Sequence, residues 1–185
     1  MKIVIVGCGR VGAAAAEIWD RDGNEVIVLD IVTRAFERLP SSFGGTAVRG
    51  DGTDEDVLRR AGAEGADVFL AMTEGDNRNI MAAQIAAEVL GIEQVIAKIN
   101  DPVRATAYAE LGIATLCRTG LMVDTVNAHI GLGPSGLPGM QAVTGHHHPV
   151  AAGAGPHGRL GATPPEVGPA AGGLADGSGA FPGED

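Results

Sequence analysis

The residues with the clearest chemical purpose stand near the start of the chain. Gly7-Cys8-Gly9-Arg10-Val11-Gly12 forms a G-x-G-x-x-G pattern directly after the apolar run KIVIV. In such a loop the first glycine allows a tight turn, the second lets the backbone approach a pyrophosphate, and the third lets the next helix pack against the strand. The amides and the dipole at the helix start attract anions. The spacing therefore predicts a site for the phosphates of a nucleotide.

A carboxylate stands where such a site needs one. The second apolar run, EVIVL, is followed by Asp30, close to the ~20-residue spacing at which an acid accepts hydrogen bonds from an adenosine ribose. This acid would repel a 2′-phosphate, so the pattern favours NAD, or an adenosine nucleotide with a free 2′-hydroxyl, over NADP. Arg34 lies close enough in sequence to leave that exclusion open.

A parallel sheet is needed to position these residues, and the sequence indicates one. Short β-branched runs alternate with longer stretches at helical spacing, which is typical of repeated βαβ units. Gly23 and Gly91 stand where helices should end, and Asp54 and Asp101 where helices should begin. Strands are expected at 2–6, 25–29, 46–49, 68–72, 94–99 and 114–117, and helices at 9–21, 34–39, 54–61, 77–90, 103–111 and 121–130. We predict an α/β fold, a doubly wound parallel Rossmann-type sheet in three layers, over residues 1–130.

Composition narrows the class of protein further. A formal net charge of -10 argues against a nucleic-acid partner. The apolar runs are too short for a membrane span or a signal peptide, and Cys8 and Cys117 suggest no disulfide framework, so we expect a cytoplasmic protein. After Ile130, glycine, alanine and most of the ten prolines replace the periodic pattern. Residues 131–185 are therefore expected to form a disordered tail.

Three further polar segments follow the predicted strands at the edge where open α/β sheets bind ligands. They are Gly50-Asp51-Gly52-Thr53-Asp54, the segment from Met72 to Asn77, and the segment from Ala97 to Pro102. By pattern alone these segments are loops and helix caps.

Together, these motifs resemble the N-terminal nucleotide-binding domain of the Trk and Ktr potassium-uptake regulators, the domain that regulates potassium conductance. The resemblance covers residues 1 to about 119. GCGRVG matches the family's glycine loop, VLD its ribose acid, GDGTDEDVL its GDATD turn, AMTEGDNRNI its fourth-strand loop, and AKINDP its ARxNDP segment.

The resemblance implies a ligand and a set of contacts. The ligand would be NAD, NADH, ATP or ADP, and its binding would change the shape of a homodimer or larger ring beneath a membrane potassium transporter or channel, at the inner face of the membrane. Gly7 to Val11 would hold phosphate, Asp30 the ribose, and Asp51, Gly52 and Thr53 the adenine side. Thr73 and Glu74 would line the second phosphate or nicotinamide half, and Arg10 and Lys98 would face the terminal phosphates. A solvated helix-start residue is the alternative interpretation of Arg10.

The chain also departs from the family. Lys98 replaces the usual arginine and so loses the planar two-pronged grip on phosphate. Gly52 replaces the commoner alanine, and the low-complexity tail stands where the family carries a ligand-sensing domain.

Other interpretations remain beside the regulator. Cys8 at a helix start could sense oxidants, and the run His146 to His148 could bind a metal, although we expect no metal site and no catalytic residue. The alternative function is an NAD-dependent oxidoreductase acting on an unidentified small molecule, for which the same loop and Asp30 would serve.

Overall fold

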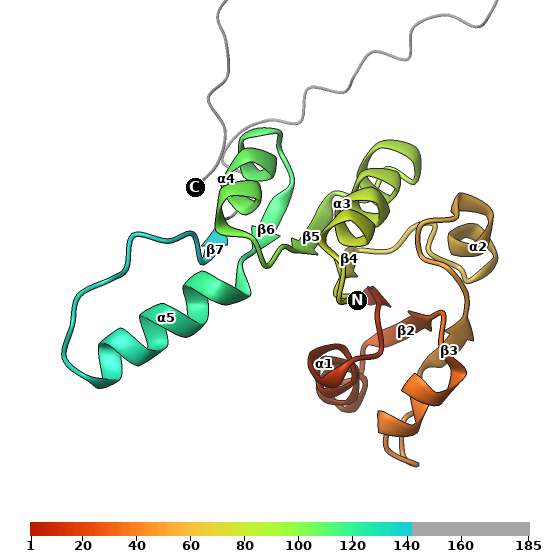
Figure 1. The fold of residues 1–185 in the computed structure, drawn as a ribbon. Helices are drawn as coiled ribbons and strands as arrows, with labels where there is room; N and C mark the ends of the chain where they lie inside the picture. The colour runs from red at the N-terminus through yellow and green to blue at the C-terminus, as the bar shows by residue number, and fades with distance from the viewer. Residues whose placement is uncertain (142–185) are drawn as a thin grey trace, which may run out of the picture. The chain divides into compact units, whose positions relative to one another are not determined.

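A computed structural model of the chain describes residues 1–141. Within that range a single sheet has the strand order β3-β2-β1-β4-β5-β6-β7 (Figure 1), and every neighbouring pair is parallel except the last. The crossover from β3 past β1 to β4 makes the sheet doubly wound, as predicted. The strands are β1 (Lys2–Val6), β2 (Glu25–Asp30), β3 (Thr46–Arg49), β4 (Val68–Ala71), β5 (Gln94–Lys98), β6 (Ala114–Leu116) and β7 (Met140–Gln141).

Helices cover both faces of the sheet. One face packs against α1 (Arg10–Arg21) and the 3-10 helix η1 (Thr33–Arg38). The other packs against α2 (Glu55–Arg60), α3 (Asp76–Gln84), its π-helical continuation η2 (Ile85–Val89), and α4 (Pro102–Glu110). These are the three layers that the sequence predicts. The last helix, α5 (Arg118–His129), follows β6.

The central strands are apolar between their ends because helices bury both of their faces. In β1, Ile3 and Ile5 point into the layer of α1, whereas Val4 and Val6 point into the layer of α2 and α3. Burying side chains of this size contributes about 1.5–3 kcal/mol each. Because both faces of β1 are buried, the strand is held in place, and so are the loop that follows it and the glycines of that loop.

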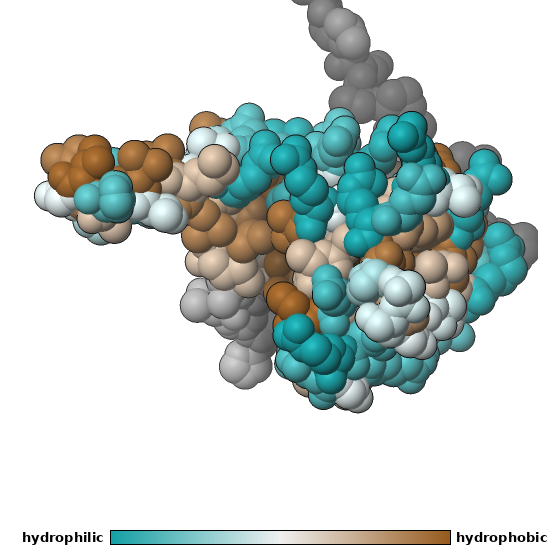
Figure 2. Space-filling model, turned by 90° about the horizontal axis from the view of Figure 1, so that it is seen from below, coloured by the Kyte–Doolittle hydropathy of each residue, from teal (hydrophilic) through white to brown (hydrophobic). Residues whose placement is uncertain are grey.

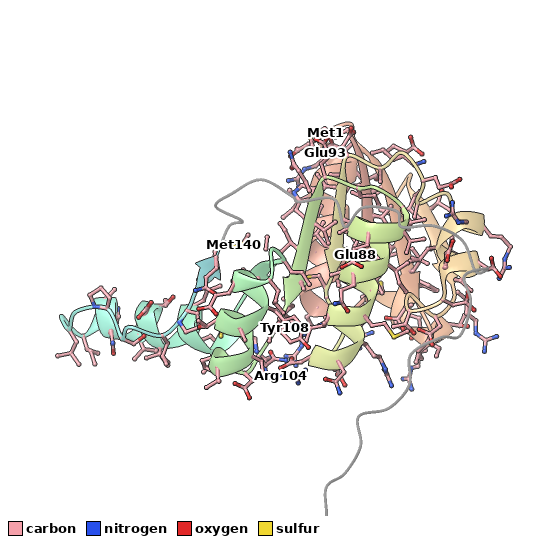
Figure 3. The ribbon with its side chains drawn as sticks, turned by 90° about the horizontal axis from the view of Figure 1, so that it is seen from above. Met1, Glu88, Glu93, Arg104, Tyr108 and Met140 are labelled. Carbon is pink, nitrogen blue, oxygen red and sulfur yellow. The ribbon has the colours of Figure 1, made fainter. Side chains whose placement is uncertain are left out.

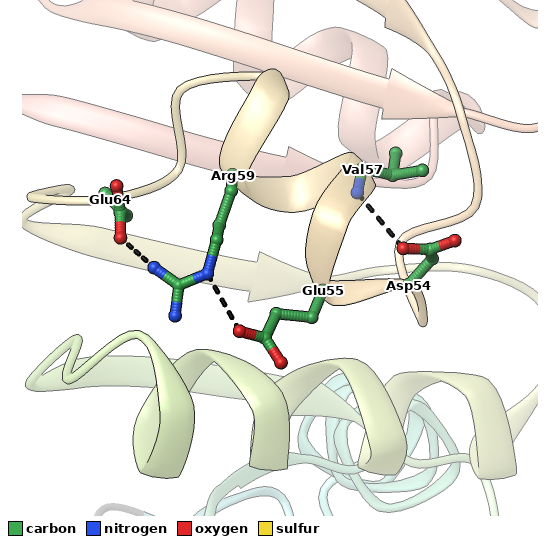
Figure 4. A network of polar contacts seen from close by, with 5 residues as sticks. All are labelled: Asp54, Glu55, Val57, Arg59 and Glu64. Atoms are coloured by element: carbon green, nitrogen blue, oxygen red, sulfur yellow. Dashed lines mark hydrogen bonds and ion pairs between the residues drawn. The ribbon is translucent and has the colours of Figure 1, made fainter.

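The start of α2 shows how the loops are anchored (Figure 4). The Asp54 carboxylate accepts a hydrogen bond from the Val57 amide at 3.1 Å and so caps the helix. Arg59 pairs with Glu55 one turn earlier and with Glu64 beyond the helix. The exposed ion pairs add little stability. The cap is the more important contact, because it sets where the loop after β3 ends.

Several details differ from the sequence-based expectations. The segment expected as a helix at 34–39 is the 3-10 helix η1, a form favoured in short segments such as this one before Pro40. The helix expected over 77–90 changes to π geometry at Ile85, where the Leu90 amide donates to the Ile85 carbonyl oxygen at 3.0 Å. The caps are confirmed: Gly23 and Gly91 have positive φ after their helices, and Asp101 caps α4 as Asp54 caps α2.

The sheet extends beyond the expected domain boundary at residue 130. The antiparallel strand β7 pairs with β6, with Leu116 opposite Met140, and the sequence analysis did not predict it. The boundary itself stays a prediction. The expected disorder of the tail falls mostly on residues 142–185, which lie outside the described residues, as does the histidine run.

Apolar side chains gather on the surface of α5 and the segment after it (Figure 2). Met122 is 61% exposed, Val126 57% and Ile130 59%. Contiguous exposed apolar surface is typical of protein contact sites. Among the helices over residues 1–141, none combines the length and the apolar character that a membrane crossing requires.

Candidate functional site

A cavity of about 670 Å³ opens at the carboxyl ends of the central strands. Its walls come from the loops after β1, β2, β3 and β4, from η1, and from the first turn of α3. The predicted residues that line it are Gly7, Cys8, Gly9, Asp30, Asp51, Gly52, Thr53, Thr73 and Glu74. Loops far apart in the sequence therefore meet at one site, as parallel strands require.

The glycines of the first loop have separate roles. Gly7 has a φ of +110°, and a Cβ there would lie 2.9 Å from the backbone of Met72 and Thr73. A Cβ on Gly12 would lie 2.1 Å from the Gly7 carbonyl oxygen, so α1 can pack this closely only without a side chain. The structural roles predicted for Gly7 and Gly12 are thus confirmed.

Gly9 differs from both of them. It is the N-cap of α1 in extended backbone, and a Cβ added to it would meet no atom within 4 Å. The fold therefore does not require glycine here. The missing side chain leaves open space at the start of a helix, beside the cavity, where a phosphate would approach the amides.

Asp30 ties the tip of β2 to the glycine loop. One carboxylate oxygen accepts a hydrogen bond from the Cys8 amide and the other from the Val32 amide, both at 2.8 Å. A carboxylate offers about four lone-pair positions, so each oxygen keeps capacity for a further donor. This arrangement fits the ribose role that the sequence predicts.

The Cys8 thiol is fully buried. Burial raises its pKa, the Asp30 charge raises it further, and Arg38 opposes this. Because the thiolate is the reactive form, the environment disfavours the redox-sensing interpretation. Cys8 serves the site through its backbone amide.

The loop after β3 folds back over the end of β1. A Cβ on Gly52 would lie 2.2 Å from Cγ1 of Val6, which places this loop directly on the first strand. Asp51 accepts hydrogen bonds from the Thr53 amide at 3.0 Å and hydroxyl at 2.8 Å. These bonds, helped by the charge of Arg78, hold the pKa of Asp51 below its usual value. Asp51 is thus a fixed anion at the rim.

A buried amide organises the loop after β4. Oδ1 of Asn79 accepts from the Thr73 amide at 2.8 Å and hydroxyl at 2.7 Å. Its Nδ2 donates to the carbonyl oxygens of Lys98, at 2.7 Å, and Thr73, at 3.1 Å. Asn79 therefore joins the ends of β4 and β5 and sets the position of Thr73. This role of Asn79 was not predicted, although the residue lies within the matched segment AMTEGDNRNI; the available signal was a polar residue directly before an apolar helical run.

A second set of polar contacts joins the loops after β4 and β5. Asp76 accepts from the amide and side chain of Asn100, both at 2.9 Å, and from the Asp101 amide at 3.1 Å. Burial would raise the pKa of Asp76, but these hydrogen bonds outweigh it and the pKa is lowered. Arg104, labelled on α4 in Figure 3, donates a hydrogen bond to the side-chain oxygen of Asn77 on α3 and so joins the two helices. These contacts fix the position of the start of α3, which lies beside the cavity.

Four predicted residues lie outside the lining of the cavity: Arg10, Val11, Gly12 and Lys98. Arg10 and Val11 are exposed on the first turn of α1. Burial and the neighbouring Arg118 lower the pKa of Lys98, while Asp76 and Glu74 act in the opposite direction. The structure thus does not bring Arg10 and Lys98 into the cavity with the glycine loop, and their phosphate contacts stay a prediction.

Three arginines line the cavity instead. Arg34 and Arg38 come from η1 near Asp30, and Arg78 comes from α3. Only Arg34 was considered from the sequence. Arg78 lies within the matched segment AMTEGDNRNI, but no motif assigns a role to the side chain of Arg38 or Arg78. Over residues 1–141, no cluster of histidine, cysteine and acidic side chains has the makings of a metal site.

The comparison with known families gives the chain its place. The profile of the TrkA-N domain matches residues 3–119, the span that carries the glycine loop, Asp30 and the three polar loops. The chain belongs to the TrkA-N domain family. The resemblance stated from the sequence motifs is thereby confirmed.

A curated relative of this TrkA-N domain is the Trk system potassium uptake protein TrkA of Streptomyces coelicolor. It is 52% identical over 124 residues, which are 67% of this chain and 56% of that protein. The chain spans about half the length of the curated relatives it matches.

Solved structures agree on the fold. The TrkA-N domain of the inner membrane protein ybaL from Escherichia coli superposes with a TM-score of 0.61 at 17% identity, over 70% of this chain and 95% of that one. The Kef CTD of Shewanella denitrificans, in AMP bound form, superposes with a TM-score of 0.58 at 21% identity, over 73% and 84% of the two chains. At these identities the likeness establishes the architecture, and the α/β Rossmann-type prediction is confirmed.

The geometry gives one departure of this TrkA-N domain a physical meaning. Gly52, where alanine is commoner, lies against Val6, and the Val6 side chain occupies the space that an alanine Cβ would need. Glycine at this position therefore lets the loop after β3 pack closely on the first strand.

Proposed function

We propose that this chain is a nucleotide-sensing regulatory subunit of a potassium uptake system, with residues 1–130 as its nucleotide-binding domain and 131–185 as a tail. The observation that carries the proposal is the cavity itself. Open space at Gly9 adjoins the amides of a helix start, and the Asp30 carboxylate stands beside it with unused acceptor capacity. Family membership and the name of the Streptomyces coelicolor relative support the potassium role.

The ligand we infer is NAD or NADH, with ATP or ADP as the other candidates. The diphosphate would lie on the amides after β1 and the adenosine ribose on Asp30. A 2′-phosphate would meet the Asp30 charge, so we expect NADP to bind more weakly. Arg34 is the nearby base that left the exclusion of NADP open. It lines the cavity, but its guanidinium is engaged in an ion pair with Glu37 at 3.5 Å.

Regulation follows from differential binding. A ligand shifts the equilibrium between two assemblies only by its difference in affinity for them. We infer that the chain self-associates as a dimer or larger ring, and the exposed apolar surface of α5 supports this. The assembly would act in the cytoplasm, at the inner face of the membrane, through a potassium transporter or channel.

A thermal-shift series with NAD, NADH, NADP, ATP, ADP and AMP tests the proposal. A ligand that binds only the folded state raises the melting temperature, and the rise is larger for a ligand of higher affinity. Adenine nucleotides that leave the melting temperature unchanged at millimolar concentration would overturn it. Purified protein is then incubated with NADH and candidate ketones and aldehydes. Binding without turnover supports the regulator, whereas steady turnover lost in Gly9→Ala supports the oxidoreductase.

The transporter link is tested separately. Deleting the gene should slow growth at limiting potassium and leave growth at high potassium unchanged. Unchanged growth at limiting potassium would contradict the regulatory role without touching nucleotide binding.

A further inference from the structure

Arg78 is a cation that lines the cavity and to which no sequence motif assigns a role. It is the third residue of α3, and side chains on a helix point back toward its N-terminus, so Arg78 leans over the carboxyl edge of the sheet. Its Cγ would lie 3.9 Å from a Cβ placed on Gly75, directly before the helix. It lines the cavity together with Asp51, Thr73 and Glu74.

An anion lies near Arg78 in this part of the cavity. Because Gly52 packs on Val6, the loop after β3 crosses the end of β1 and brings Asp51 toward α3. The Arg78 charge helps to lower the pKa of Asp51, so the two groups are within electrostatic range. Among the ion pairs of residues 1–141, however, none joins them within 4.0 Å. The carboxylate and the guanidinium therefore line the same cavity without being paired.

The rest of the site directs the base toward this part of the cavity. With phosphates on Gly9 and a ribose on Asp30, a base that extends away from the glycine loop reaches the part of the cavity formed by the loops after β3 and β4. The edge of adenine presents an amino donor next to a ring-nitrogen acceptor, whereas guanine presents two acceptors there. A fixed carboxylate beside a guanidinium matches the donor and acceptor of adenine.

We propose that Arg78 is a specificity-determining residue of this site: it donates a hydrogen bond to a ring nitrogen of the bound adenine while Asp51 accepts from the amino group. The inference rests on the proposed nucleotide function. It deepens that function by naming a residue that recognises the adenine base. Thr53, through its hydrogen bonds to Asp51, is a positioning residue.

Calorimetric titration of the full chain with ADP and GDP tests the inference. Wild type should bind ADP at least tenfold more tightly than GDP. Arg78→Ala should weaken ADP about tenfold, which corresponds to ~1.4 kcal/mol, and should weaken GDP much less. Arg78→Lys, which keeps the charge but loses the planar donor geometry, should fall between them. The matched control is Arg60→Ala on the exposed end of α2, outside the cavity, which should leave both affinities unchanged.

Each other outcome is decisive. Equal ADP affinity in wild type and Arg78→Ala overturns the inference, and so does an equal loss for ADP and GDP, which would place Arg78 on a phosphate. If the wild type binds none of ADP, GDP and NAD, the proposed function itself is overturned. Unliganded melting temperatures identify a variant that fails to fold, in which case Arg78→Lys decides.

Discussion

Replacing Gly9 by alanine should separate the binding site from the fold. Gly9 has φ of -75° and ψ of -173°, which any residue adopts, and the new Cβ would meet no atom within 4 Å. Alanine reduces the entropy of the unfolded chain, which stabilises by about 0.4–1 kcal/mol, but it is a poorer N-cap than glycine, which costs a similar amount. We expect the free energy of unfolding without ligand to change by less than about 0.5 kcal/mol.

The neighbouring change Gly12→Ala gives the contrast. Its Cβ would stand 2.1 Å from the Gly7 carbonyl oxygen, a backbone atom fixed by the turn, so the helix or the loop must move. Overpacking of this kind costs about 1–3 kcal/mol or more. At roughly 2–4 °C per kcal/mol, the melting temperature of Gly12→Ala should fall by several degrees.

The assay is thermal unfolding of wild type, Gly9→Ala and Gly12→Ala, with and without NAD and ADP. A ligand at a hundred times its Kd stabilises by about 2.7 kcal/mol. Gly9→Ala should lose most of this stabilisation because its methyl group fills the space of a phosphate. The reasoning is refuted if Gly9→Ala binds as wild type does, or if without ligand it is as unstable as Gly12→Ala.

Three other variants test other parts of the site. Asp30→Ala should weaken ADP tenfold or more and weaken 2′,3′-dideoxy-ADP much less, measured by calorimetry, because losing the hydrogen bond to the Cys8 amide affects both ligands whereas losing the ribose contact affects only ADP; equal losses would exclude the ribose contact. The lowered folded pKa of Asp76 contributes stability that is present above the unfolded value of about 3.9 and is lost as pH falls through the folded pKa. The stability difference between wild type and Asp76→Asn in urea should therefore shrink on acidification; a constant difference would contradict this. Gly52→Ala should destabilise wild type yet stabilise the Val6→Ala variant, since the smaller side chain vacates the space that the Cβ needs; two independent, additive effects would show that the residues do not touch.

Local signals were sufficient for much of the fold. The β-branched runs predict six of the strands because strands buried on both faces must be apolar throughout. Asp54 and Asp101 predict helix starts because a side-chain acceptor can satisfy the free amides of a first turn. The strand β7 was missed, since two residues paired at a sheet edge leave no periodic pattern.

The candidate site divides in the same way. Gly7 and Gly12 follow from the sequence because the tight turn and the close helix packing that need them form within one strand, turn and helix. The approach of the Met72 and Thr73 backbone to Gly7 is a further requirement that only the tertiary structure reveals. Arg38, Arg78 and Asn79 do not follow from the sequence: Arg38 and Arg78 come from different elements and meet only at the cavity, and Asn79 reaches the end of β5 through the Lys98 carbonyl oxygen. Conversely, Arg10 and Lys98, which the family resemblance places at the terminal phosphates, lie outside the lining of the cavity, and their contacts stay a prediction.

By itself, the sequence determined which residues could grip a diphosphate and a ribose, and that a parallel sheet would carry them, since glycine turns, caps and apolar runs act over a few residues. Only the tertiary structure decided which side chains share the cavity. The approach of Asp51 to Arg78 depends on the loop after β3 crossing β1, where Gly52 meets Val6. That contact joins residues that are far apart in the chain, and a local sequence pattern cannot predict the distance between such residues.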